Sequence, residues 1–294
     1  MRVGFTQDFP DVLLNEPLSK HTSFRIGGPA DIFLLPKSTD ELIKIAEKCV
    51  KLSYPFTLIG DGTNVLVLDE GIRGVVVSTK QMNNFDFTCD GKLRADAGAR
   101  LGKLAEEACS RSFDGLAFAA GIPGTIGGAV FMNAGAYGSE IGDFVCSVTV
   151  FDGCKRMLSK SEMEFGYRSS ILQKNSSIVL EVNLQLKKGL MQDIRKKVVE
   201  LNAQRKESQP LDSLSAGSTF KRPPDRFAAE LIDKTGLKGF QIGGARVSDK
   251  HAGFIINTGN ASAKDVLELM EAVRQKVFEA HKIMLEPEVR VLGA

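Results

Sequence analysis

The sequence GLAFAAGIPGTIGGAVFMNAGAYGS, residues 115–139, is a run of twenty-five residues without a charged side chain. It is long enough to span a bilayer, but seven glycines and Pro123 interrupt it, so we expect no membrane insertion. The glycines predict a backbone that turns repeatedly and leaves N–H groups bare for an anion such as a pyrophosphate. A glycine-rich turn buried for packing is the alternative that this stretch leaves open.

A second glycine loop, Gly60-Asp61-Gly62-Thr63-Asn64, lies between two predicted strands at 56–59 and 65–68. The P-loop and the Rossmann fingerprint both need a helix directly after the glycine loop. No helix is predicted here, so a dinucleotide site would have to belong to another fold.

Composition excludes several classes of protein. A net charge of +2 over 294 residues gives no general attraction to nucleic acid, so we expect no nucleic-acid partner. The five cysteines are scattered, which favours reduced thiols, and residues 1–21 do not have the pattern of a signal peptide. His21, His251 and His281 have no zinc-ligand spacing. We expect a cytoplasmic protein without a metal site.

Hydrophobic periodicity and capping residues predict an α+β chain. Helices are expected over residues 39–52, 101–108, 191–206, 227–235 and 262–281. Further strands are expected over residues 74–78, 146–151, 253–257 and 288–292. Near residues 187–190 a strand-like segment that ends in a turn gives way to a charged, helix-like segment, and this change predicts a domain boundary.

Six segments, in order, resemble the bacterial UDP-N-acetylenolpyruvoylglucosamine reductases of peptidoglycan synthesis. They are HTSFRIGGPAD (21–31), GDGTN (60–64), AGIPGTIGGAVFMNAGAYG (120–138), FGYRSS (165–170), SAGSTFKRP (215–223) and LEPEVRVLG (285–293). The chain is similar to the shorter, type II branch, because the longer lobe with a substrate-clamping tyrosine is absent.

The resemblance implies a PCMH/vanillyl-alcohol-oxidase-type FAD-binding fold. It would have two α+β subdomains, residues 1–72 and 73–188, and a C-terminal α+β substrate-binding domain, residues 189–294, whose last strand returns to the active site. A monomer is expected.

The implied reaction reduces UDP-N-acetylglucosamine enolpyruvate to UDP-N-acetylmuramate. NADPH would reduce a non-covalent FAD, and flavin N5 would then deliver the hydride. By resemblance, Ser218 gives the proton, while Arg168 and Glu288 stabilise the enolate. Without the resemblance, the sequence favours other interpretations: Ser218 as a turn residue, Arg168 as part of a surface ion pair and Glu288 as a solvated strand residue.

The matched motifs also supply binding residues. Tyr167 is expected to orient Arg168 or pack on the flavin, and Lys221 and Arg222 are expected to bind the substrate. Ser208 and Arg222 differ from many relatives, which puts substrate affinity in doubt. The expected cofactor contacts are Gly60, Asp61, Gly62, Thr63, Asn64, Gly121, Pro123, Gly124, Thr125, Gly127, Gly128, Asn133 and Gly135.

Two other functions stay open. One is a different FAD-dependent sugar or alcohol oxidoreductase of the same fold, which needs a substrate base and often a covalent flavin. The other is a flavin- or nucleotide-binding module without catalysis, which the presence of Ser218, Arg168 and Glu288 disfavours.

Overall fold

The computed structural model describes residues 2–175 and 177–293 and divides into two compact units. Unit 1 contains the residues up to Val12 together with Phe33–Asp61 and Val75–Arg205. Unit 2 contains Leu13–Ile32, Gly62–Gly74 and the residues from Lys206 onward. The division of the cofactor-binding part into subdomains 1–72 and 73–188 stays a prediction.

The helices are α1 (Arg2–Asp8), α2 (Thr39–Lys51), α3 (Leu101–Ser110), α4 (Ile126–Met132), α5 (Met191–Ser208), α6 (Ala228–Lys234) and α7 (Ala263–His281). The strands up to residue 136 are β1 (Leu13–Pro17), β2 (Pro29–Leu34), β3 (Phe56–Ile59), β4 (Val65–Val67), β5 (Ile72–Ser78), β6 (Phe85–Phe87), β7 (Lys92–Asp96), β8 (Phe113–Asp114) and β9 (Gly135–Ala136). The later strands are β10 (Ser139–Glu140), β11 (Val145–Phe151), β12 (Lys155–Ser159), β13 (Ile178–Gln185), β14 (Lys187–Lys188), β15 (Leu214–Ser215), β16 (Gln241–Ile242), β17 (Ala245–Val247), β18 (Ile255–Asn257) and β19 (Arg290–Leu292).

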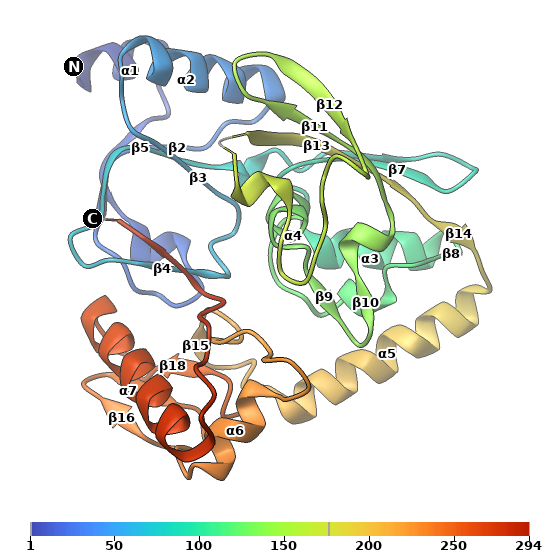
Figure 1. Ribbon diagram of the computed structural model, residues 1–294. Helices are drawn as coiled ribbons and strands as arrows, with labels where there is room; N and C mark the ends of the chain where they lie inside the picture. The colour runs from blue at the N-terminus through green and yellow to red at the C-terminus, as the bar shows by residue number, and fades with distance from the viewer. Residues whose placement is uncertain (1, 176, 294) are drawn as a thin grey trace. The chain divides into compact units, whose positions relative to one another are not determined.

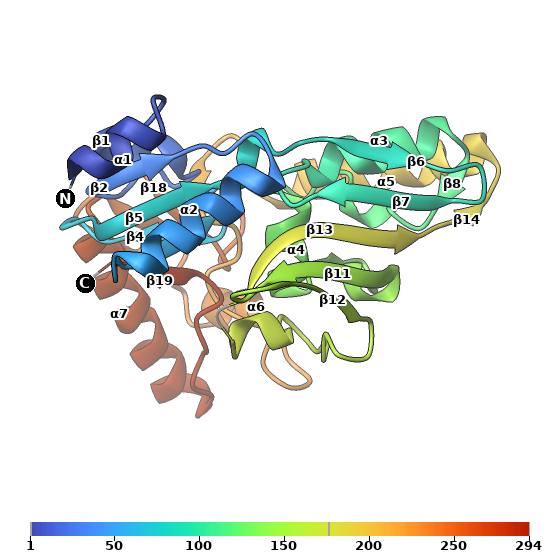
Figure 2. The ribbon, with the colours of Figure 1, turned by 90° about the horizontal axis from the view of Figure 1, so that it is seen from above.

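Unit 1 is built on an antiparallel sheet with the order β12-β11-β13-β7-β6, seen from above in Figure 2. In the register of this sheet, Val148 of β11 lies between Leu158 of β12 and Val182 of β13. Helix α4 packs against β13 and β7, and the apolar residues of α3 and α4 join those of the strands in one core cluster. In the same unit, β3 pairs in parallel with β5.

Unit 2 is built on an antiparallel sheet with the order β15-β18-β17-β16. The long helix α7, labelled in Figure 1, packs against β16, β17 and α6. Leu231, Val266, Leu269 and Val273 belong to a second core cluster, all of whose residues lie in unit 2. Strand β19 pairs in parallel with β4.

The predicted elements are present with small shifts at their ends. The predicted start of the last helix at residue 262 is confirmed by a capping box there, in which the Ser262 hydroxyl accepts from Asp265 N–H and the Asp265 carboxylate accepts from Ser262 N–H. At Ser38 only half of the box forms, because the Glu41 carboxylate accepts from Lys37 N–H instead.

The central glycine stretch differs from the prediction of repeated turns, since it contains the seven-residue helix α4. None of the helices in residues 2–175 and 177–293 has the length and apolar character needed to cross a membrane.

Candidate functional site

A short antiparallel ladder in unit 2 connects the segment after Ser218 with the segment before β19. Phe220 pairs with Pro287, and Glu288 N–H donates to the Thr219 carbonyl at 2.8 Å. One step further along, Lys221 N–H donates to the Glu286 carbonyl at 2.8 Å. Because antiparallel partners face each other in register, Glu288 lies opposite Thr219, the residue after Ser218, although the two segments are far apart in sequence. Ser218 and Glu288 are both half-buried.

The end of the Gly60–Asn64 loop is attached to the same ladder. Asn64 Nδ2 donates to the Glu288 carbonyl at 3.2 Å, and Arg290 N–H donates to the Asn64 carbonyl at 3.0 Å. Gly62 has a φ of 66°, and a Cβ there would collide with the His21 carbonyl oxygen. Unit 2 therefore brings Gly62, Thr63 and Asn64 together with Ser218 and Glu288.

The two predicted substrate cations follow Ser218 in the same segment. The half-buried Lys221 forms an ion pair with Glu286, with 2.5 Å between Nζ and Oε1. The exposed Arg222 places its guanidinium 4.2 Å from the centroid of the Phe227 ring. Contact of Lys221 and Arg222 with a substrate stays a prediction.

In unit 1, the start of the same loop lies against the N-terminus of α4. The Gly60 carbonyl accepts from Ser78 Oγ at 2.9 Å, and a Cβ on Gly60 would collide with Thr125 Oγ1. Thr125 is the N-cap of α4 and accepts from Gly128 N–H at 3.3 Å. Asp61 forms an ion pair with Arg100, with 3.4 Å between Oδ2 and Nε. Glycine at position 60 thus lets the two glycine-rich segments approach closely.

The expectation of bare N–H groups is wrong for the first turn of α4. Ile126 N–H donates to the Ala99 carbonyl at 2.8 Å, Gly127 N–H donates to the Ala97 carbonyl at 2.9 Å, and Gly128 N–H is used by the N-cap. These bonds arise because the residues following β7 run alongside the helix N-terminus and supply acceptors.

The glycines of the segment nevertheless leave part of its backbone uncovered by their own side chains. Gly121 and Gly124 are half-buried, whereas Pro123 and Gly128 are exposed. Apart from its chain neighbours and the backbone of α4, the atom nearest to a Cβ on Gly128 would be Thr125 Oγ1, at 3.6 Å. Such a surface fits close backbone approach by a flat or extended cofactor.

Arg205 of α5 is a residue that sequence reasoning missed. A Cβ on Gly121 would lie 3.0 Å from Arg205 Cδ, so this side chain borders the glycine segment. Burial lowers the pKa of the Arg205 guanidinium, while the nearby Tyr137 acts in the opposite direction. An arginine within a charged helix gives no signal in the sequence that it will be buried.

Arg168 lies at the corner of a tight turn in unit 1. Gly166 and Ser169 exchange two backbone hydrogen bonds, of 3.1 and 3.0 Å, and Tyr167 and Arg168 lie between them. The Arg168 guanidinium donates to the Gly135 carbonyl at 2.9 Å and lies 5.1 Å from the centroid of the exposed Tyr167 ring. Tyr167 therefore contacts Arg168, and Gly135, expected at the cofactor, holds the arginine head group.

Asn133 has a different environment from the other expected cofactor residues. It caps the C-terminus of α4 with a φ of 44° and is 0% exposed. Such burial does not favour direct contact between Asn133 and a bound cofactor.

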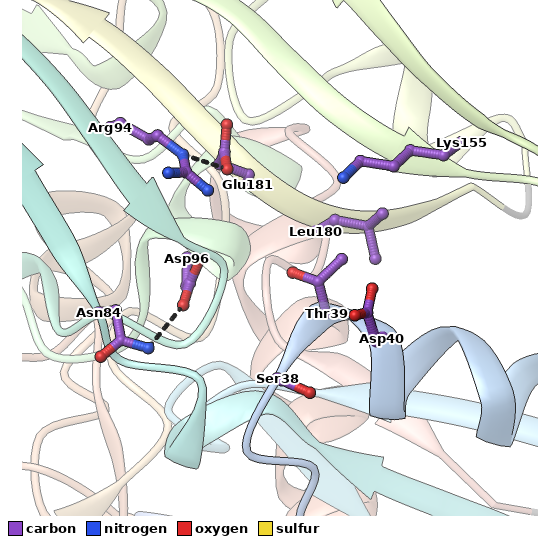
Figure 3. Close-up of a pocket in the computed structure, with 9 residues that line it drawn as sticks. All are labelled: Ser38, Thr39, Asp40, Asn84, Arg94, Asp96, Lys155, Leu180 and Glu181. Carbon is purple, nitrogen blue, oxygen red and sulfur yellow. Dashed lines mark hydrogen bonds and ion pairs between the residues drawn. The ribbon is translucent and has the colours of Figure 1, made fainter.

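A separate hollow of about 290 Å³ in unit 1 is shown in Figure 3. It is lined by Ser38, Thr39, Asp40, Asn84, Arg94, Asp96, Lys155, Leu180 and Glu181. None of these nine is a predicted site residue. Arg94 is paired with Glu181, and Asn84 Nδ2 donates to Asp96, so these four residues of the lining satisfy one another. Within residues 2–175 and 177–293, no group of three or more His, Cys, Asp and Glu side chains could hold a metal ion.

Two family models match the chain. One, described as the C-terminal domain of UDP-N-acetylenolpyruvoylglucosamine reductase, matches residues 209–292, and the other, an FAD binding domain, matches residues 30–155.

Relatives named UDP-N-acetylenolpyruvoylglucosamine reductase match nearly the full length. The protein from Caldanaerobacter subterraneus subsp. tengcongensis is 51% identical over 95% of this chain and 93% of its own. The protein from Lachnoclostridium phytofermentans is 49% identical over 96% of this chain and 93% of its own. The crystal structure of the Thermus caldophilus reductase superposes with a TM-score of 0.83 at 37% identity, covering 96% of this chain and 98% of that one.

Proposed function

The chain belongs to the UDP-N-acetylenolpyruvoylglucosamine reductase family, and from this premise we propose that it reduces UDP-N-acetylglucosamine enolpyruvate to UDP-N-acetylmuramate. Its vanillyl-alcohol-oxidase-type fold contains an FAD-binding domain, and its cofactors are non-covalent FAD and, as co-substrate, NADPH. The predicted monomeric state and cytoplasmic location stay predictions.

The observation that carries the proposal is the backbone ladder in unit 2 that bonds Glu288 to Thr219, the residue after Ser218. Reduction of an enol ether conjugated to a carboxylate needs a proton donor at one carbon and stabilisation of the charge that develops on the carboxylate. The hydroxyl of Ser218 and the carboxyl group of Glu288, whose segments this ladder joins, would supply one group of each kind. Flavin that NADPH has reduced would supply the hydride from N5 to the adjacent carbon.

Each of the three proposed catalytic residues has a distinct part in the reaction. Ser218 Oγ gives its proton to the carbon next to the substrate carboxylate. The planar fork of Arg168 donates to that carboxylate as it becomes an enediolate. Glu288 hydrogen-bonds the same group and must carry or share a proton, since an ionised carboxylate would repel the developing charge.

The FAD contacts proposed for the glycine segments are backbone contacts. Gly60 lies against Thr125 at the N-terminus of α4 in unit 1, while the glycines between Gly121 and Gly128 present the partly exposed backbone described above. Lys221 and Arg222 are proposed to bind the nucleotide end of the substrate, because both are cations on the segment that carries Ser218.

A flavin spectrum combined with an NADPH oxidation assay tests the proposal. The purified protein should show flavin absorbance, and NADPH oxidation should depend on UDP-N-acetylglucosamine enolpyruvate. The flavin should be released by denaturation, which separates this enzyme from oxidases with covalent flavin. A protein that takes up no FAD, or that oxidises NADPH at the same rate without the sugar nucleotide, would contradict the proposal.

A further inference from the structure

We infer that Gln173 and Asn133 are positioning residues that hold the turn Gly166–Ser169 so that Arg168 meets the substrate carboxylate in a fixed orientation. This inference rests on the proposed catalytic role of Arg168. It concerns only residues of unit 1.

The backbone at Arg168 needs external support. Its φ of 52° is in the left-handed region, which L side chains with a Cβ rarely adopt. A glycine at this corner of the turn would avoid the strain, but it would remove the guanidinium. Such a conformation persists where surrounding contacts over-determine it.

Gln173 holds the turn at Arg168 itself. Its Nε2 donates to the Arg168 carbonyl at 3.0 Å and to the Phe131 carbonyl of α4, also at 3.0 Å. One amide group thus connects the strained residue directly to the helix. The half-buried side chain lies at the end of the short helical turn Ile171–Gln173.

Asn133 holds the same turn at its first residue. Its Nδ2 donates to the Gly166 carbonyl at 2.9 Å, while its Oδ1 accepts from Gly142 N–H at 3.0 Å. Asn133 is itself the left-handed C-cap of α4, so its side chain starts from a backbone fixed by the helix. Both of its polar atoms are used inside the protein, which explains its complete burial.

The guanidinium is oriented from the same region of the chain. It donates to the Gly135 carbonyl, two residues beyond Asn133, at 2.9 Å. The end of α4 and the residues after it therefore fix the first residue of the turn, the carbonyl of Arg168 and its head group. Donors aligned before the substrate arrives stabilise developing charge without reorganisation during the reaction.

A double-mutant cycle separates positioning from ordinary structural support. Gln173→Glu keeps the size of the side chain and removes the donor to the Arg168 carbonyl. Gln185→Glu is the matched control, because half-buried Gln185 also donates to two carbonyls of unit 1, those of Asp90 and Leu186, at 2.9 and 3.0 Å. Both variants are combined with Arg168→Ala, and Gln173→Met repeats the test without a new charge.

The measured quantities are the two half-reactions of the FAD-loaded enzyme. Gln173→Glu should slow reoxidation of the reduced flavin by the enolpyruvyl sugar nucleotide about 10- to 100-fold, and leave flavin reduction by NADPH unchanged. Gln185→Glu should leave both rates near wild type. In the Arg168→Ala background, Gln173→Glu should cause no further loss, since the group that it positions is gone.

Each outcome has one meaning. Additive losses in the double variant, or equal losses for Gln173→Glu and Gln185→Glu, would overturn the inference and leave the proposed function intact. Near wild-type reoxidation in Arg168→Ala would instead overturn the catalytic role of Arg168, and the inference with it. Asn133→Asp, which removes the donor to the Gly166 carbonyl, should follow the pattern of Gln173→Glu.

Discussion

Backbone hydrogen bonds hold the segments that carry Ser218, Arg168 and Glu288. Glu288 N–H donates to the Thr219 carbonyl, so the segment of the carboxyl group is bonded to the residue after Ser218. Arg168 lies in a turn whose two ends are bonded to each other. Motif matching predicted these three residues, but it gave no sign of Gln173, whose importance depends on a tertiary contact with Arg168.

Glu288→Gln tests the most unusual of the proposed roles. If Glu288 shares a proton with the developing enediolate, the neutral amide should lose about 3 to 4 kcal/mol of transition-state stabilisation, measured from kcat/KM. The exposed Glu279 of α7 provides the control, and Glu279→Gln should retain wild-type kinetics. Wild-type kcat/KM in Glu288→Gln would remove Glu288 from the mechanism.

Gly128→Ala tests whether the exposed face of α4 is where the cofactor lies. The added methyl group has room in the protein, since its nearest neighbour is 3.6 Å away, and alanine favours a helix by about 1 kcal/mol over glycine. The flavin-free variant should therefore melt no lower than wild type, while its Kd for FAD rises. Unchanged FAD affinity would place the cofactor elsewhere.

At the scale of the elements, much of the chain could be predicted from periodicity and capping. α7 begins at Ser262 as expected, and no helix follows the Gly60–Asn64 loop, which leads into β4. α4 could not be predicted, because Gly127 and Gly128 both disfavour a helix. Its first turn is held by acceptors at Ala97 and Ala99, and such contacts are invisible in local sequence.

The N-terminus of α7 gives a pH-dependent prediction. Backbone N–H groups of Ser262 and Gly244 lower the pKa of the Asp265 carboxyl below its ordinary value of 3.8. Its stabilising effect is thus fully present above the pKa of the unfolded chain and is lost as the pH falls through the lower, folded pKa.

Asp265→Asn should consequently be less stable than wild type at neutral pH, and the difference should shrink in strong acid. Urea unfolding of both proteins at neutral and acidic pH measures this difference. Asp212→Asn, at an exposed position of the same unit, is the control. A stability difference that stays constant with pH would show that the charge of Asp265 is unimportant.

At the scale of the whole molecule, two separate core clusters stabilise the chain. One lies entirely in unit 1 and the other entirely in unit 2. The change in sequence character predicted a domain boundary near residues 187–190, directly before α5 begins at Met191, and the two compact units divide within this helix, after Arg205. Residues 13–32 and 62–74 belong to unit 2 together with the C-terminal part of the chain. Composition could not predict this.

Separate cores predict separate unfolding of the flavin-free protein. Leu104→Ala in the first cluster and Leu269→Ala in the second should each cost about 2–5 kcal/mol, because both leucines are fully buried. Calorimetry should resolve two transitions, with each substitution lowering only one. A single transition lowered equally by both would mean that the two clusters unfold together.

The central claim is that Ser218 delivers the proton that completes reduction of the enol ether, and transient kinetics of Ser218→Ala test it most directly. Ser213→Ala, at a partly buried serine of the same segment, is the matched control. The account predicts that NADPH still reduces the flavin of Ser218→Ala at the wild-type rate, while UDP-N-acetylglucosamine enolpyruvate reoxidises it about 10²- to 10⁴-fold more slowly. Reoxidation of the reduced Ser218→Ala enzyme at the wild-type rate would contradict it.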